Sequence, residues 1–272
     1  GGSREEWPIR RPLDKTPAGH ATLRPMDTDA SPLSLYLGLG DSISIDDYAG
    51  GSGCGAISLL ARNRDDRFPE FAGRDLASHF PGVRVEARAQ DGATTRGVLE
   101  EQIFRLPLVP EGRTLVTLTA GGNDLLMLLQ MRGTLLDEDG EGVVRRLRSG
   151  VATIRNRFPD SLVILSTIYD PTDGVGDLLT PGQPLIRGLD VLARVNDGIR
   201  GIAEGDPGVV VADLHRHFLG HGSHHAEEAN PYYHPEDPTG WLVQAIEPNE
   251  RGASEVRRCW WQCLVEAGWV PE

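Results

Sequence analysis

Lysine is almost absent from this chain of 272 residues. Lys15 is the single lysine, and the other 26 of the 27 Lys and Arg residues are arginine. A Walker-type phosphate loop needs a Gly-Lys-Ser or Gly-Lys-Thr sequence, and Schiff-base chemistry needs a buried lysine. Because Lys15 lies in a proline-rich segment near the N-terminus, both chemistries are excluded.

Long apolar runs, paired cysteines and excess positive charge are also missing. No stretch of about 18 apolar residues occurs, so no membrane-spanning segment is predicted. Cys54, Cys259 and Cys263 are odd in number and lack a Cys-x-x-Cys spacing, so they indicate no disulfide framework. The formal net charge of −13 argues against nucleic acid or an anionic membrane as the main partner.

The chain divides into an arm and one domain. Residues 1–33, rich in Pro, Arg and Asp, are expected to form an extended arm ahead of a domain over residues 34–272. In that domain, apolar runs of strand length alternate with segments of helical periodicity, which predicts a doubly wound α/β fold that binds ligands at the carboxyl ends of its strands. The predicted strands are 35–39, 83–87, 114–119, 162–167 and 209–212, and the predicted helices are 67–80, 95–106, 124–132, 142–158, 189–203 and 253–267. Residues 215–248 are expected to form a long irregular loop.

Three short motifs follow the first three predicted strands. Ser42 lies in Gly-Asp-Ser-Ile-Ser directly after the first strand, where its hydroxyl would project into the crevice above the sheet, although a strand-end serine also commonly caps a helix. Gly92 follows the second strand, and its N–H could donate to an oxyanion or simply serve a turn. Asn123 lies in Gly-Gly-Asn-Asp after the third strand, where its amide could donate to an oxyanion or cap the following helix.

Taken in this order on consecutive strands, the motifs resemble those of the SGNH/GDSL hydrolase family over roughly residues 34–267. The resemblance implies a flavodoxin-like three-layer α/β/α sandwich with a five-stranded parallel sheet. It also implies an esterase or acyl hydrolase that needs no cofactor and acts on a small-molecule, carbohydrate or lipid ester. Ser42 would be the nucleophile, and the backbone N–H groups of Ser42 and Gly92 and the side chain of Asn123 would form the oxyanion hole.

The last motif of the family is altered in this chain. The family has Asp-x-x-His-Pro-Asn-x-x-Gly, with the histidine as general base, whereas residues 244–252 read Gln-Ala-Ile-Glu-Pro-Asn-Glu-Arg-Gly. Glu247 therefore stands in place of the histidine and Gln244 in place of the aspartate. A glutamate with an ordinary pKa of about 4.3 is a weaker base than histidine near neutral pH, unless burial raises that pKa.

Three interpretations of this change remain open. In one, Glu247 is itself the base; in the second, a loop histidine is the base and Glu247 orients it; in the third, the site is degenerate and the protein binds a ligand without turnover. We favour the second over the first, and the first over the third, because a carboxylate holding an imidazole follows the usual logic of a catalytic triad. His234 is the first choice among the histidines because it is nearest to Glu247 in the sequence.

The predicted loop is rich in histidine, which raises the alternative of a metal site. It holds six of the eight histidines of the chain: His215, His217, His221, His224, His225 and His234. Their spacing matches no His-Glu-x-x-His helix and no cysteine lies near them, so solvated loop histidines are favoured and no metal is predicted.

Overall fold

The structure, a computed structural model, describes residues 32–109, 111–180, 182 and 185–271. All but the last two positions of the predicted arm over residues 1–33 lie outside these described residues. Within the described part, no helix combines the length and the apolar character that crossing a membrane requires.

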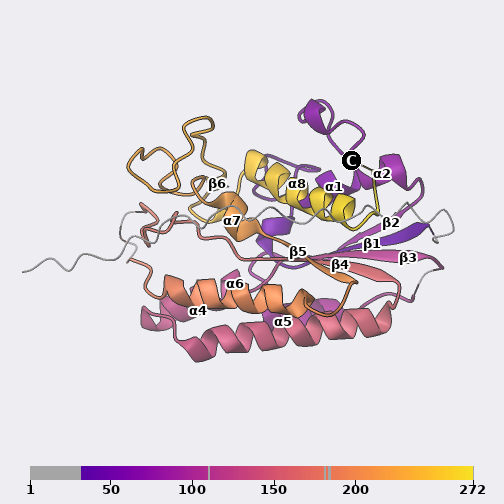
Figure 1. The fold of residues 1–272 in the computed structure, drawn as a ribbon, viewed down its shortest axis with the longest axis horizontal. Coiled ribbons are helices and arrows are strands. Elements are labelled where there is room, and N and C mark those ends of the chain that lie inside the picture. Colours follow the sequence, from indigo (N-terminus) through magenta and orange to yellow (C-terminus); the bar gives the residue numbers. More distant parts are fainter. Residues whose placement is uncertain (1–31, 110, 181, 183–184, 272) are drawn as a thin grey trace, which may run out of the picture.

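Five strands form one parallel sheet, as predicted, and their order in the sheet is β2-β1-β3-β4-β5 (Figure 1). The strands are β1 (Leu33–Leu39), β2 (Arg84–Ala87), β3 (Arg113–Leu118), β4 (Ser161–Ser166) and β5 (Val209–Ala212). The chain moves to one side of β1 to form β2 and to the other side to form β3. In such a sheet, ligands bind outside the carboxyl ends of the strands at the point where the strand order reverses, here between β1 and β3.

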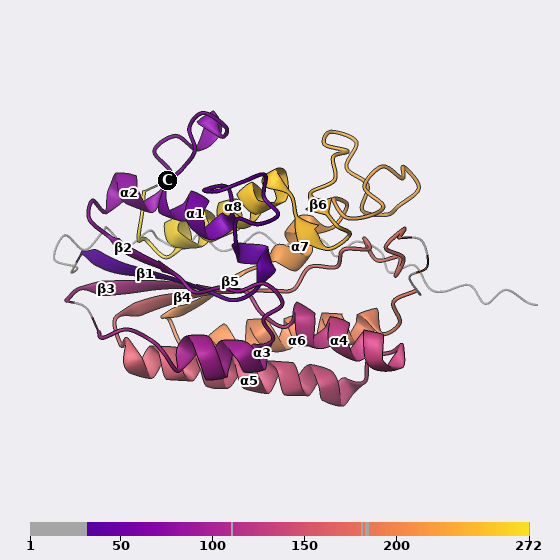
Figure 2. The ribbon, with the colours of Figure 1, turned by 180° about the vertical axis from the view of Figure 1, so that it is seen from behind.

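Helices cover both faces of the sheet and complete the predicted three-layer sandwich (Figures 1 and 2). One face carries α1 (Ala56–Ala61), α2 (Leu76–His79), α7 (Leu214–Phe218) and α8 (Glu250–Glu266). The other carries α3 (Thr95–Gly97), the π-helical segment η3 (Val98–Ile103), α4 (Gly122–Arg132), α5 (Asp137–Arg157) and α6 (Leu189–Ala203).

The central strand β1 explains why both faces are covered. Its side chains alternate between two apolar clusters: Leu35, Leu37 and Leu39 join the cluster of α5 and α6, and Tyr36 joins the cluster of α8. A strand buried on both faces is a continuous apolar run, which is the pattern that identified it in the sequence.

Two predicted helices differ from the observed elements. The pattern over residues 67–80 yields only the 3₁₀ turn η2 (Pro69–Phe71) and the single turn α2. Gly73 adopts a left-handed φ of 77° between them, and the Asp75 carboxylate accepts from the Ser78 N–H at 2.8 Å to begin α2 anew. The pattern over residues 142–158 extends further than predicted, because α5 begins at Asp137 with three acidic residues in its first turn.

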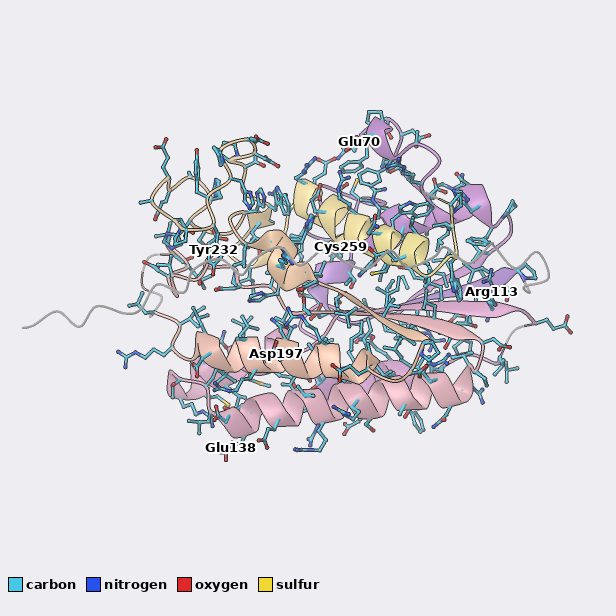
Figure 3. All side chains as sticks on the ribbon, in the orientation of Figure 1. Glu70, Arg113, Glu138, Asp197, Tyr232 and Cys259 are labelled. Atoms are coloured by element: carbon cyan, nitrogen blue, oxygen red, sulfur yellow. The ribbon has the colours of Figure 1, made fainter. Side chains whose placement is uncertain are left out.

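The predicted loop over residues 215–248 contains some regular structure. It starts within α7 and ends in a small hairpin of β6 (Leu242–Val243) and β7 (Glu247–Pro248). Between them the chain is irregular and is tied to the segment after β4. The buried Asp173 carboxylate accepts the backbone N–H groups of Gly220, Gly222 and His224 at 2.8, 3.0 and 3.0 Å. Tyr232 lies on this loop and is partly exposed (Figure 3).

Candidate active site

Ser42 lies just beyond the carboxyl end of β1. Gly40 adopts a φ of 133°, and a Cβ there would lie 2.1 Å from the Thr119 carbonyl oxygen, so the tight turn requires glycine. Asp41 then caps the short 3₁₀ turn η1 (Ser42–Ser44) by accepting from the Ile43 N–H at 3.3 Å. As the first residue of η1, Ser42 keeps 6% of its surface exposed, on the pocket described below.

Asp41 is a buried acid next to Ser42. Its Oδ1 accepts from the Thr119 hydroxyl at 2.8 Å, and its backbone N–H donates to the same hydroxyl at 3.3 Å. Burial raises the pKa of Asp41 to about 6, the hydrogen bonds from the Thr119 hydroxyl and the Ile43 backbone N–H oppose this rise, and the nearby Glu247 adds to it. Negative charge is therefore unfavourable around Ser42.

Asn123 approaches the same place from the carboxyl end of β3. Gly121, with a φ of 116°, turns the chain into α4, and Asn123 is the second residue of that helix. One amide hydrogen of Asn123 goes to the Ala93 carbonyl oxygen at 3.1 Å. That bond joins α4 to the turn that contains Gly92, whose φ is 70°.

A partly buried ion-pair network holds this turn and α4 together. The Asp124 carboxylate accepts both the backbone N–H and the hydroxyl of Thr95, each at 2.7 Å. Arg146 of α5 donates to the Asp124 carboxylate at 2.9 Å and to the Thr95 hydroxyl at 2.6 Å. The positions of Asn123 and Gly92 are therefore linked through one charged cluster rather than through the sheet alone.

Glu247 reaches Ser42 from β7. The residue is 9% exposed and lines the same pocket as Ser42, and its Oε2 is buried with no hydrogen-bond partner among the described residues. Burial raises the pKa of Glu247, the contact with Ser42 opposes this rise, and the charge of Asp91 adds to it. A buried carboxyl with a raised pKa next to a hydroxyl is suited to accept a proton.

The short segment before Glu247 has a strained backbone and is held by one short hydrogen bond. Gln244 and Ala245 have left-handed φ angles of 50° and 71°, and the Tyr169 hydroxyl donates to the Ile246 carbonyl oxygen at 2.5 Å. Gln244 does not line the pocket of Ser42 but an adjoining depression, so it does not orient Glu247 as the aspartate of the family motif orients a histidine.

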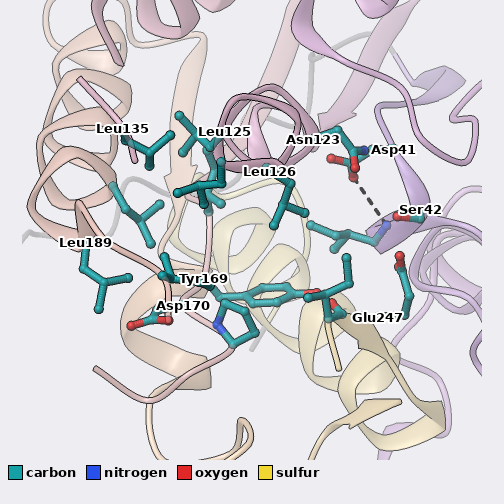
Figure 4. Close-up of a pocket in the computed structure, with 18 residues that line it drawn as sticks. Asp41, Ser42, Asn123, Leu125, Leu126, Leu135, Tyr169, Asp170, Leu189 and Glu247 are labelled. Carbon is teal, nitrogen blue, oxygen red and sulfur yellow. Dashed lines mark hydrogen bonds between the residues drawn. The ribbon is translucent and has the colours of Figure 1, made fainter. Parts of the chain in front are cut away.

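One pocket brings these groups together (Figure 4). Ser42, Asp41, Asn123 and Glu247 lie at one end, and the rest of the wall is largely apolar. Gly92 is not among the lining residues, although Asn123 is tied to its turn.

His234 is placed elsewhere. Its ring is exposed, its Nε2 donates to the Leu219 carbonyl oxygen at 2.9 Å, and it stacks on His221, which stacks in turn on Trp241. His217, His221, His234 and Trp241 line a second cavity against α8 that shares no residue with the pocket of Ser42. Within the described part of the chain, no three His, Cys, Asp or Glu side chains are grouped to hold a metal ion.

Several site residues escaped the sequence analysis. Asp41 and Asp91 stand beside predicted motif residues, but only the fold shows that their charges act on Glu247 or respond to it. The sequence did not point to Arg146, because a single arginine in an amphipathic helix is expected to face solvent. The sequence also did not reveal the apolar pocket wall that α4 and α6 form, since leucines at helical spacing predict core packing.

Comparison with known proteins identifies a family and a fold. The model of the GDSL-like lipase/acylhydrolase family matches residues 39–239, a match that ends before Glu247. No curated protein matches the chain.

Several solved structures share the architecture. The acetylxylan esterase Axe2 from Geobacillus stearothermophilus is 20% identical, with a TM-score of 0.54 over 89% of this chain and 98% of that one. An extracellular lipase from Streptomyces rimosus is also 20% identical, with a TM-score of 0.51 over 86% of this chain and 99% of that one. A member of the lipolytic protein G-D-S-L family from Veillonella parvula is 17% identical, with a TM-score of 0.52 over 84% and 97% of the two chains. At these identities the likeness establishes the fold.

Proposed function

Because this chain belongs to the GDSL-like lipase/acylhydrolase family, we propose that it hydrolyses carboxylic esters with Ser42 as nucleophile and Glu247 as general base. The observation that supports this proposal is the meeting of Ser42, Asn123 and Glu247 at one end of a single pocket. Each comes from a different segment, after β1, after β3 and on β7, so the fold assembles them from distant parts of the sequence.

In the proposed mechanism, the Ser42 oxygen attacks the ester carbonyl while its proton passes to Glu247. The tetrahedral oxyanion accepts hydrogen bonds from the Asn123 amide and from the backbone N–H group of Ser42, two residues that line the pocket. Protonated Glu247 then gives its proton to the departing alcohol, which leaves an acyl-Ser42 ester. Water, deprotonated by Glu247, attacks this ester, and the proton returns to Ser42 as the acid departs.

The contacts of Asn123 support its place in this scheme. A side-chain amide has two N–H donors, and Asn123 uses one on the Ala93 carbonyl oxygen. The other remains for the substrate, while the first fixes the orientation of the amide. A donor held before the reaction begins is what makes an oxyanion hole effective, and removing one such donor commonly costs about 10²–10³-fold in rate.

The surroundings of Glu247 support a carboxylate in the role that histidine has elsewhere in the family. Burial and the charge of Asp91 both raise its pKa, which strengthens it as a base. Proton transfer from Ser42 neutralises a carboxyl whose Oε2 has no partner, so the pocket favours the protonated product. His234 is less suited to the role, because it lines the other cavity and its Nε2 is bonded to the Leu219 carbonyl.

The test is the hydrolysis of p-nitrophenyl acetate and butyrate by Ser42→Ala. We expect kcat/KM to fall by at least about 10³-fold, as when a triad nucleophile is removed. Ser52→Ala, at an exposed position in the loop before α1, is the matched control and should retain the rate of the unaltered enzyme. Unchanged hydrolysis by Ser42→Ala would refute the proposed function.

A further inference from the structure

We propose that the pocket beside Ser42 binds an aliphatic acyl chain, so that the preferred substrates are uncharged esters of acids longer than acetate. The alcohol part of these esters carries no negative charge close to the carbonyl. This inference rests on the proposed function and adds the chemical class of its substrate.

The first argument is the composition of the pocket wall. Beyond the polar end, apolar side chains come from α4, from α6 and from the segments after β4 and before β7 (Figure 4). They include Leu125, Leu126, Leu129, Ile168, Leu189 and Leu192. An acyl group on Ser42 that points toward Leu189 would cover this surface, and burial of apolar area favours binding.

The second argument is the shortage of hydrogen-bonding groups away from Ser42. Asp170 is the polar side chain at the far end near Leu189, and both of its carboxylate oxygens are occupied. Oδ1 accepts from the N–H and hydroxyl of Thr172 at 2.9 and 2.6 Å, and Oδ2 accepts from the Gly174 N–H at 2.9 Å. A sugar placed in this part of the pocket would bury hydroxyl groups with few partners, which is costly.

The third argument is the sign of the charge. The charged residues that line the pocket are Asp41, Asp170 and Glu247, all acidic, and Asp91 acts on Glu247 from nearby. Among the described residues, no arginine, lysine or histidine lines it. A phosphate or carboxylate on the substrate would therefore meet repulsion without a compensating cation, whereas a neutral or cationic alcohol would not.

The first experiment measures kcat/KM for p-nitrophenyl esters of acids with two, four, six and eight carbons. Burial of one methylene corresponds to about a four-fold gain, so kcat/KM should rise by up to that factor per added methylene until the pocket is filled. A profile that is highest for acetate and falls steadily with chain length would overturn the proposal.

A variant that fills the pocket tests whether the acyl chain binds there. Leu126→Phe adds volume in the apolar wall, and Met127→Phe, at the next position of α4, is the matched control because Met127 is half exposed and does not line the pocket. The octanoate-to-acetate ratio of kcat/KM should fall at least about ten-fold in Leu126→Phe and stay unchanged in Met127→Phe. An unchanged ratio in both variants would contradict the placement of the acyl chain.

A matched pair of substrates tests the charge. The butyrate ester of 4-hydroxybenzoate differs from that of methyl 4-hydroxybenzoate only by its free carboxylate, and butyrate release is followed for both. The uncharged ester should be hydrolysed with at least about ten-fold higher kcat/KM, and the ratio should shrink with added salt. Equal rates would refute the charge argument. Complete absence of Ser42-dependent hydrolysis for all these esters would instead count against the proposed function itself.

Discussion

Two cavities of this molecule differ in which residues they gather and in what those residues are bonded to. The pocket at the ends of β1 and β3 holds Ser42, Asn123 and Glu247, and the Glu247 Oε2 has no hydrogen-bond partner in the part of the chain that the structure describes. The cavity against α8 holds His217, His221 and His234, whose rings are bonded to Glu255, the Thr239 carbonyl and the Leu219 carbonyl. Histidine, the residue type most often used as a general base, therefore holds the loop in place here. The side chain next to the serine is a carboxylate.

For identifying a candidate general base, the position of a side chain relative to the strand ends is therefore more informative than its residue type. Histidine is the commonest general base, yet a ring stacked on a neighbour and bonded to a backbone carbonyl supports the loop rather than a reaction. Four substitutions test this contrast.

Glu247→Gln should produce the largest change. The amide has the shape of the carboxylate but cannot accept the Ser42 proton, so kcat/KM for p-nitrophenyl butyrate should fall by about 10²–10⁴-fold. Glu250→Gln, three residues further on and paired with Arg67 at the surface, is the matched control. Full activity in Glu247→Gln would show that another group is the base. The proposed difference in role between the two cavities would then be wrong.

Arg146→Gln should have an intermediate effect. It removes the cation that bonds both the Asp124 carboxylate and the Thr95 hydroxyl, so Asn123 and the turn of Gly92 should become less well fixed. Because an oxyanion hole acts mainly in the transition state, kcat should fall about ten-fold with little change in KM. Arg145→Gln, exposed at the preceding position of α5, is the control, and thermal unfolding of both variants separates the effect from lost stability. Equal changes in kcat and KM that follow the loss of stability would argue against a positioning role.

Asp91→Asn should change the pH dependence. Ionised Glu247 is the proposed base, so kcat/KM should rise with pH through the pKa of Glu247 and be lost below it. The charge of Asp91 raises that pKa, so its removal lowers the pKa and moves the acidic limb to lower pH. Asp66→Asn, at an exposed position paired with Arg64, should leave the limb in place. A shift to higher pH in Asp91→Asn would contradict Glu247 as the group that titrates.

His234→Ala should have the smallest effect. The ring is exposed and lies in the cavity against α8, so kcat/KM should change less than about two-fold, as for most surface substitutions. The measurement is the same butyrate assay at the pH of the plateau. A loss as large as that of Glu247→Gln would instead assign the base to the loop, with Glu247 orienting the histidine.

The sheet was predictable from the sequence for a physical reason. A strand buried on both faces must be apolar throughout, so each of the five runs stands out, and the observed strands begin and end within two residues of the predicted ones. Because parallel strands end at one edge, motifs that follow β1 and β3 had to meet there. The loops between the strands have no influence on this meeting point.

The loops were not predictable in this way. His234 is closer to Glu247 in the sequence than the other histidines are, but the Asp173 carboxylate draws the loop onto the segment after β4, and stacking on His221 fixes His234 there. Such contacts depend on single polar atoms far apart in the chain and leave no periodicity. The apolar wall of the pocket was hidden for the opposite reason, since core leucines and pocket leucines have the same spacing on a helix.

Ser42 and Glu247 are held by different parts of the fold, because Glu247 lies on the hairpin of β6 and β7. Ser42 is built into the end of the central strand, where Gly40 leaves no room for change. Glu247 pairs with Val243 across a three-residue turn in which two non-glycine residues, Gln244 and Ala245, adopt left-handed backbone. Substitutions in that turn can move the carboxylate or relax its support without disturbing the sheet. The acid in place of histidine thus lies on a short hairpin outside the main sheet.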